Sequence, residues 1–264
     1  MRRWFAGMVA VVALGGCGGS AEVASTPTRT PVPLPIATPT SIADRCKIPV
    51  DGGLTEFPAP SGGVMTGAVL GDGPVVAVLL HQTSAQGFCG FATYAAWLAE
   101  HGVRAVLVDL CGWGRARCQG AFASDLQAQV RLPVDWARAH GATRVTVVGA
   151  SMGGALALGF AQQAGADALV DLSGPAVWTG TPTAGEAAAA TTIPLLLAVA
   201  PNDADMDPTA LRAAVRASPA RDKRFISTEG GHGWTMLNDG TDAEPDWTPL
   251  ADAVRDWVKG DYVG

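Results

Sequence analysis

The chain has 264 residues, of which 48% are hydrophobic, and its formal net charge is -6. This length and apolar content fit one large globular domain with a full core. An acidic protein offers no basic surface to attract the phosphates of nucleic acid, so we do not expect a nucleic-acid-binding protein.

Residues 1–17 are typical of an export signal. Two arginines precede an apolar run over residues 4–14, and small residues lead to Cys17. The run is short for a membrane span, which favours a cleaved signal over a permanent helix. The letters LGGC at its end resemble the lipobox of bacterial lipoproteins, which implies a lipid on Cys17 and an anchor at the outer face of the cell membrane. The alternative is an ordinary cleaved signal with an incidental cysteine, and both alternatives imply export.

Residues 18–45 are rich in Pro, Thr and Ser and nearly free of large apolar side chains. Such a stretch cannot bury enough surface to offset the entropy lost on ordering, and its prolines favour an extended chain. We therefore expect a disordered tether, followed by one folded domain over residues 46–264.

Four cysteines follow the tether, and an even number in an exported chain predicts two disulfides. They are Cys46, Cys89, Cys111 and Cys118, and three pairings are open. The short loop between Cys111 and Cys118 favours a bond between these two, which leaves Cys46 to pair with Cys89. Since disulfides account for the cysteines and no His/Cys/Asp cluster has ligand spacing, we expect no metal site.

Short apolar runs alternate with helical patterns along the domain. The runs are apolar on consecutive residues, as expected of strands covered on both faces. The alternation predicts an α/β protein with a mainly parallel central sheet flanked by helices. The predicted strands are residues 64–70, 75–80, 103–110, 145–148, 168–172, 193–199 and 224–227, and the predicted helices are residues 90–101, 124–140, 152–164, 208–217 and 247–258.

The letters GASMG at residues 149–153 place a serine between glycines, where a predicted strand meets a predicted helix. A strand that turns sharply into a helix needs glycines there, because a Cβ would collide with neighbouring backbone. The turn lifts the Ser151 hydroxyl above the carboxyl edge of the sheet, at a helix N-terminus that favours negative charge. A hydroxyl is a weak nucleophile, so Ser151 requires a base, and the base requires a carboxylate.

His232 is the expected base. It is the only one of the four histidines that follows Ser151, and it lies between glycines just after the last predicted strand. Those glycines would allow the loop to curl back over the serine. His101 and His140 lie at predicted helix ends, where they are expected to interact with the helix dipole.

The orienting acid is expected in the loop after the penultimate predicted strand. Asp203 is nearest to the end of that strand and is the preferred residue. Asp205, in the same loop, and Asp171, at the end of the preceding strand, are the alternatives. Asp207 precedes Pro208 and is expected to cap the following helix.

These segments, in this order, resemble the α/β-hydrolase family over roughly residues 54–260, and in particular its compact dienelactone-hydrolase-like and esterase-like members. The resemblance is carried by HQTSAQGFCGFATYAAWLAEHGVRAVLVDLCGWGRA, VVGASMGGALAL, AVAPNDAD and EGGHGW. It implies an oxyanion hole formed by the backbone N–H groups of Thr83 and Met152. Gln82 stands where the family usually has glycine, and His81 is expected to support this loop structurally. The stretch after the sixth strand is short, so we expect no large cap domain.

The resemblance implies a serine hydrolase, with a carboxylic ester of small or short-acyl type as its substrate and no cofactor. Trp178 and Trp234 flank the expected site and either line it or fill space at its rim. We expect a monomer whose partners are the ester and, through the lipid, a membrane. The alternatives are a peptidase or acyltransferase with the same triad, and a non-catalytic lipid-anchored binding protein.

Overall fold

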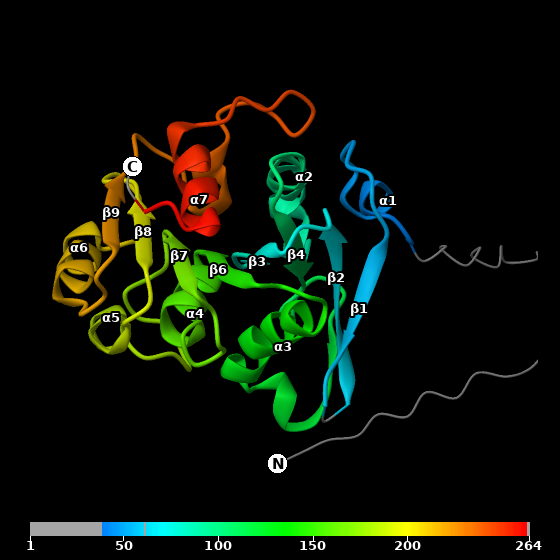
Figure 1. Cartoon of the computed structure of the whole chain (residues 1–264), viewed down its shortest axis with the longest axis horizontal. Helices are drawn as coiled ribbons and strands as arrows, with labels where there is room; N and C mark the ends of the chain where they lie inside the picture. Colours follow the sequence, from blue (N-terminus) through cyan, green and yellow to red (C-terminus); the bar gives the residue numbers. More distant parts are fainter. Residues whose placement is uncertain (1–38, 61, 263–264) are drawn as a thin grey trace, which may run out of the picture. The chain divides into compact units, whose positions relative to one another are not determined.

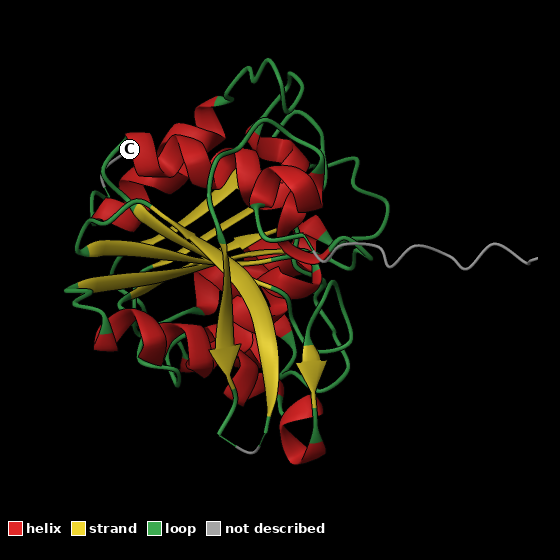
Figure 2. Ribbon diagram, turned by 90° about the vertical axis from the view of Figure 1, so that its right-hand side faces the viewer, coloured by secondary structure: helices red, strands yellow, loops and turns green. Residues whose placement is uncertain are grey.

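The centre of the folded domain is a nine-stranded sheet with helices on both faces (Figures 1 and 2). The computed structural model describes residues 39–60 and 62–262. The strand order is β1-β2-β4-β3-β6-β7-β8-β9, and the short β5 pairs with β2. The strands from β4 through β3 to β9 run parallel, whereas β2 is antiparallel to both of its long neighbours. The predicted α/β class with a mainly parallel sheet is confirmed.

The strands and α-helices follow the predicted order, and the sequence patterns did not indicate four of them, namely α1, β1, β5 and α5. The strands are β1 (Leu54–Pro58), β2 (Gly63–Leu70), β3 (Val75–Leu80), β4 (Arg104–Val108), β5 (Arg117–Cys118), β6 (Arg144–Ala150), β7 (Ala168–Leu172), β8 (Leu195–Val199) and β9 (Lys223–Ser227). The helices are α1 (Ile42–Cys46), α2 (Ala92–Glu100), α3 (Leu126–Ala139), α4 (Met152–Phe160), α5 (Ala184–Ala190), α6 (Pro208–Ala217) and α7 (Pro249–Lys259), and η3 (Gly233–Leu237) is a 3-10 helix.

The sheet separates two hydrophobic cores because successive side chains of a strand point to opposite faces. In β3, Val76 and Val78 pack in the core with α3 and α4, while Ala77 and Leu79 pack in the core with α2 and α7. All four side chains are fully buried. This two-sided burial explains why the central strands are apolar on consecutive residues.

The folded domain begins before residue 46, so the expected boundary between tether and domain was wrong. Residues 42–46 form α1, which is capped by the Ser41 side chain. Ile42 is fully buried against the core beside α2, and its backbone N–H donates to Gly52 O at 2.9 Å. A single apolar residue in a polar stretch has no periodicity, which is why the pattern did not reveal this helix.

Both preferred disulfides are confirmed. Cys46 pairs with Cys89 across 43 residues, with Cα atoms 5.3 Å apart, and Cys111 pairs with Cys118, with Cα atoms 5.6 Å apart. The first bond joins α1 to the segment that precedes α2. The second closes the loop that leads to β5.

The carboxyl edge of the sheet carries no large cap within the described residues. The segment between β7 and β8 contains only α5, whose first turn is closed by a capping box of Thr183 and Glu186. No helix in the described ranges has the length and apolarity that crossing a membrane requires.

Candidate active site

Ser151 occupies a strained turn between β6 and α4. Its backbone has φ 49° and ψ -115°, a region that non-glycine residues rarely adopt. A Cβ on Gly149 would lie 1.9 Å from Gly153 O, and a Cβ on Gly153 would lie 2.1 Å from Leu80 O. Both glycines are therefore required by close backbone packing. The strain is held in place by the surrounding sheet, where Ser151 N–H donates to Leu172 O at 2.8 Å.

His232 and Asp203 are joined by a hydrogen bond between Nδ1 and Oδ2 at 2.7 Å. Asp203 lies in the loop after β8 and its side chain is 5% exposed, whereas the imidazole is 32% exposed. The loop after β9 can turn at the histidine because Gly231 and Gly233 have φ values of 87° and 60°. This arrangement leaves Nε2 of the ring for a second partner, as a general base requires.

The histidine loop lies against the strand that leads to the serine. A Cβ on Gly233 would lie 3.1 Å from the Cβ of Ala150, the residue before Ser151. The η3 helix that starts at Gly233 also contacts β6 and β7. The described residues contain no hydrogen bond between the Ser151 hydroxyl and the His232 ring. Such bonds are often long before substrate binds, and the packing places the two residues at the same edge of the sheet.

The structure distinguishes the candidate acids. Asp205 is exposed, and its backbone N–H lies 3.4 Å from Asp203 Oδ1. Asp207 caps α6 by accepting the N–H of Ala210 at 2.9 Å, as expected. Asp171 does not contact His232 through any hydrogen bond in the described part of the chain, so it is not the partner of the imidazole.

Asp171 is instead buried beside the serine turn. It is paired in the sheet register with Gly149, and its Oδ1 accepts the N–H of Gly174 at 2.6 Å. A Cβ on Gly154, in the first turn of α4, would lie 2.2 Å from the same oxygen. Oδ2 has no partner among the described residues. Burial raises the pKa of this carboxyl from 3.8 to about 7, and the Gly174 hydrogen bond opposes this effect.

We expect Asp171→Asn to stabilise the protein above neutral pH. In the unfolded chain the carboxyl ionises near pH 4, whereas the folded protein retains the proton until about pH 7. Wild-type stability therefore falls as pH rises between these values, and the amide variant has no such loss. Urea denaturation should show a gain of roughly 1–3 kcal/mol at pH 8 and little gain at pH 4. Asp135→Asn, at an exposed position, is the control. If Asp171→Asn raised the free energy of unfolding equally at pH 8 and pH 4, the raised pKa of Asp171 would not be the cause.

The start of α4 packs against the loop after β3. A Cβ on Gly153 would lie 2.1 Å from Leu80 O and 2.9 Å from His81 O. The turn after Ser151 therefore contacts the end of β3. The two expected oxyanion donors, Met152 N–H and Thr83 N–H, belong to these adjoining segments. The structure thus brings these two segments together, and the oxyanion role of the two N–H groups stays a prediction.

His81 holds the peptide that contains Thr83 N–H. Its Nε2 accepts the backbone N–H of Leu110 at 3.0 Å, so the proton resides on Nδ1, which donates to Gln82 O at 2.6 Å. The ring is fully buried, and burial lowers its pKa, which keeps it neutral. The expected supporting role thus has a concrete form, because Gln82 C=O and Thr83 N–H are parts of one planar peptide unit.

Gln82 approaches the histidine loop. A Cβ on Gly233 would lie 2.3 Å from Gln82 Oε1, so the amide fills the space that a side chain at position 233 would need. Oε1 is buried without a partner in the described ranges. The glutamine that replaces the usual glycine therefore contacts the loop of His232 through its side-chain amide.

The two tryptophans lie on different sides of the sheet. Trp234, in η3, packs edge-on against Phe91 with ring centroids 5.7 Å apart and covers Gly90. Trp178 is half-buried against the core that contains α4 and α5. His101 and His140 end α2 and α3 as expected, and each ring nitrogen Nδ1 lies 2.7 Å from a carbonyl oxygen four residues earlier.

No group of three or more His, Cys, Asp and Glu side chains within residues 39–60 and 62–262 is arranged to hold a metal ion. Cys17, the expected lipidation site, lies outside the described residues.

The strand order, the serine turn and the two loops that follow β8 and β9 define the α/β-hydrolase fold. Residues 77–189 match the family described as serine aminopeptidase, S33. No curated protein sequence matches the chain.

Solved structures with the same fold cover most of the chain. An esterase from Pyrococcus furiosus has a TM-score of 0.62 at 12% identity, covering 90% of this chain and 98% of the esterase. A thermophilic esterase from Thermogutta terrifontis, solved with malate bound, has a TM-score of 0.62 at 15% identity. The match covers 80% of this chain and 99% of the esterase. A serine hydrolase without lid from Xanthomonas campestris has a TM-score of 0.51 at 18% identity. The match covers 68% of this chain and 84% of that hydrolase. At these identities the likeness concerns the fold.

Proposed function

We propose that the protein is a serine hydrolase that cleaves small or short-acyl carboxylic esters. The main support is the hydrogen bond of 2.7 Å between His232 Nδ1 and Asp203 Oδ2. The loops that carry these two residues lie at the edge of the sheet where Ser151 occupies its strained turn. A serine, a buried carboxylate and a histidine, which follow β6, β8 and β9 in this chain order, are the parts that acyl transfer requires.

In the proposed reaction, Ser151 Oγ attacks the ester carbonyl while His232 Nε2 takes the hydroxyl proton. Asp203 accepts a hydrogen bond from Nδ1–H of the ring, selects the reactive tautomer and stabilises the imidazolium. The backbone N–H groups of Thr83 and Met152 stabilise the negative charge on the carbonyl oxygen. His232 then gives its proton to the leaving alcohol, and water releases the acyl group through the same base.

The preference for small esters is inferred from the absence of a large cap in the described residues, since only α5 lies between β7 and β8. An open site buries little of a long acyl chain, so extra methylenes gain little binding energy. The solved structures similar in fold include esterases and one hydrolase without lid. The matching family is described as an aminopeptidase, which keeps amide hydrolysis as the second candidate.

A substrate series tests the proposal. The purified full chain is assayed with p-nitrophenyl esters of increasing acyl length, beside amide and thioester analogues with the same acyl group. We expect kcat/KM to be highest for short esters and to fall as the chain lengthens. A preference for long chains would contradict the open site, and faster amide than ester hydrolysis would favour a peptidase. Absence of fluorophosphonate labelling in the folded protein would favour a non-catalytic binding protein.

We also propose export of this protein and attachment to the outer face of the cell membrane through a lipid on Cys17. The signal-like residues 1–17 and the two disulfides, which persist in oxidising compartments, support export. Mass spectrometry of the membrane fraction should show a diacylglyceryl N-terminal peptide that Cys17→Ser abolishes.

A further inference from the structure

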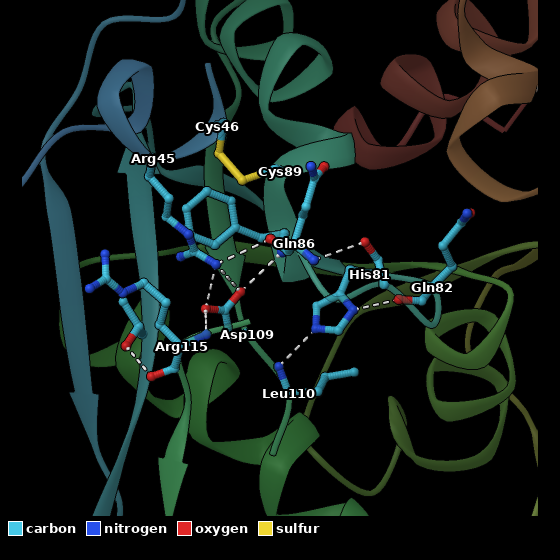
Figure 3. Close-up of polar contacts among 12 residues, drawn as sticks. Arg45, Cys46, His81, Gln82, Gln86, Cys89, Asp109, Leu110 and Arg115 are labelled. Atoms are coloured by element: carbon cyan, nitrogen blue, oxygen red, sulfur yellow. Dashed lines mark hydrogen bonds and ion pairs between the residues drawn. A yellow bond between two sulfur atoms is a disulfide. The ribbon is translucent and has the colours of Figure 1, made fainter. Parts of the chain in front are cut away.

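A buried ion pair lies beside the loop that carries the proposed oxyanion donor Thr83 (Figure 3). Arg45 Nη2 lies 2.8 and 2.6 Å from the two carboxylate oxygens of Asp109. The side chain of Arg45 is 5% exposed and that of Asp109 is 0% exposed. Arg45 belongs to α1 and Asp109 follows β4, so the pair joins the N-terminal helix to the carboxyl edge of the sheet.

The Asp109 carboxylate also binds the backbone of two loops. Oδ1 accepts the N–H of Phe88, in the loop after β3, at 3.0 Å. Oδ2 accepts the N–H of Arg115, in the loop after β4, at 2.7 Å. A Cβ on Gly87 would lie 2.0 Å from Oδ1, and a Cβ on Gly114 would lie 2.4 Å from the same carboxylate. The two loops are therefore closed tightly around this one side chain.

One path from this ion pair leads to the turn that follows Thr83. Arg45 Nη2 donates to Gln86 O at 3.2 Å, and Gln86 N–H donates to Ser84 Oγ at 3.2 Å. Gly87 N–H donates to Ser84 O at 2.9 Å. The turn of residues 84–87 is thus closed by its own hydrogen bonds and is held to Arg45 at Gln86, and Thr83 is the residue immediately before it.

A second path reaches the oxyanion peptide itself. Leu110, which follows Asp109, donates its N–H to His81 Nε2, and His81 Nδ1 donates to Gln82 O. The N–H of a trans peptide points opposite to its C=O. Holding Gln82 C=O toward His81 therefore directs Thr83 N–H away from that ring. Figure 3 shows His81 between Leu110 and Gln82, with Asp109 alongside.

The Cys46–Cys89 disulfide joins α1 to the segment of Phe88, whose N–H the Asp109 carboxylate accepts. Cys46 is next to Arg45 in sequence, and Cys89 is next to Phe88. The guanidinium carbon of Arg45 also lies 4.0 Å from the centroid of the Phe88 ring. The covalent bond therefore limits the ways in which Arg45 can move away from Asp109.

We propose that Arg45 is a positioning residue for the oxyanion hole: held by the Cys46–Cys89 disulfide, it fixes through Asp109 the loop that presents Thr83 N–H. The inference rests on the proposed hydrolase function. A buried ion pair is a poor source of stability, because desolvation of both charges offsets their attraction. Donors in an oxyanion hole, in contrast, stabilise the transition state only when they are held in place before the reaction.

Arg45→Met tests the proposal, and Arg138→Met, which removes the arginine of a partly exposed ion pair, is the control. Arg138 Nη2 lies 2.6 Å from Asp167, whose carboxylate accepts Val145 N–H at the start of β6, away from the carboxyl edge. Because Arg45→Met leaves a buried charge on Asp109 and risks misfolding, the double variant Arg45→Met/Asp109→Asn, which removes both charges, is prepared in parallel. Circular dichroism and thermal melts identify the folded variants.

The readout is hydrolysis of p-nitrophenyl acetate and of its thionoester, in which sulfur replaces the oxygen that the hole binds. In the folded Arg45 variants we expect kcat for the oxygen ester to fall about 10²-fold with KM changed little, and the ester-to-thionoester rate ratio to fall as well. Cys46→Ser/Cys89→Ser should change both quantities in the same direction, and Arg138→Met should change neither.

Wild-type kcat and rate ratio in the folded double variant would overturn the positioning role and leave the hydrolase proposal intact. Absence of Ser151-dependent turnover in the wild-type protein would overturn both.

Discussion

Replacing Ser151 with alanine is expected to lower kcat for short esters by at least ~10³-fold, and His232→Ala should have an effect of similar size. The serine provides the atom that forms the acyl-enzyme, and without the imidazole its hydroxyl keeps its proton. The two losses should not add in the double variant, because both residues act in one step. Steady-state kinetics with p-nitrophenyl acetate and fluorophosphonate labelling provide the measurement.

The fold should tolerate both substitutions. Ser151 is held in its turn by backbone contacts, including its N–H to Leu172 O, and alanine retains them. His232→Ala removes the bond to Asp203 on a partly exposed loop. The control is Ser124→Ala, whose exposed hydroxyl donates to Ala121 O and which should retain full activity. Equal labelling of wild type and Ser151→Ala would remove the serine from the mechanism.

Asp203→Asn is expected to lower kcat by about 10⁴-fold with KM changed little. The asparagine amide can donate to Nδ1, which leaves the proton on Nε2, and that tautomer cannot accept the serine proton. The carboxylate also stabilises the imidazolium, and an amide cannot replace its charge.

Two other aspartates are the controls for this assignment. Asp205→Asn alters an exposed residue in the same loop, and Asp171→Asn alters the buried carboxyl beside the serine turn. Both variants should keep kcat within a few-fold of wild type. A 10³-fold or larger loss in Asp171→Asn, with Asp203→Asn close to wild type, would transfer the orienting role to Asp171.

Some of the supporting residues were visible in the sequence only as isolated polar positions. Asp109 is the last residue but one of the apolar run 103–110, and a buried strand end is an unfavourable place for a carboxylate without a partner. That signal indicated that a partner must exist but not which one. Arg45 lies 64 positions earlier, at the end of a stretch whose composition indicated a tether. Composition averages over many residues and therefore concealed a single buried isoleucine and a single buried arginine.

Local sequence patterns were sufficient to predict the parallel sheet, the glycine-flanked turn at Ser151 and the order of serine, acid and histidine along the chain. These features depend on side-chain alternation and backbone sterics within a few residues, so they can be read from local patterns. The sequence favoured Asp203 over Asp171, but the hydrogen bond to His232 and the place of α1 in the domain were established by the folded chain. Those outcomes depend on which distant segments pack together, across 29 positions for the histidine and acid, and local sequence carries no information about that packing.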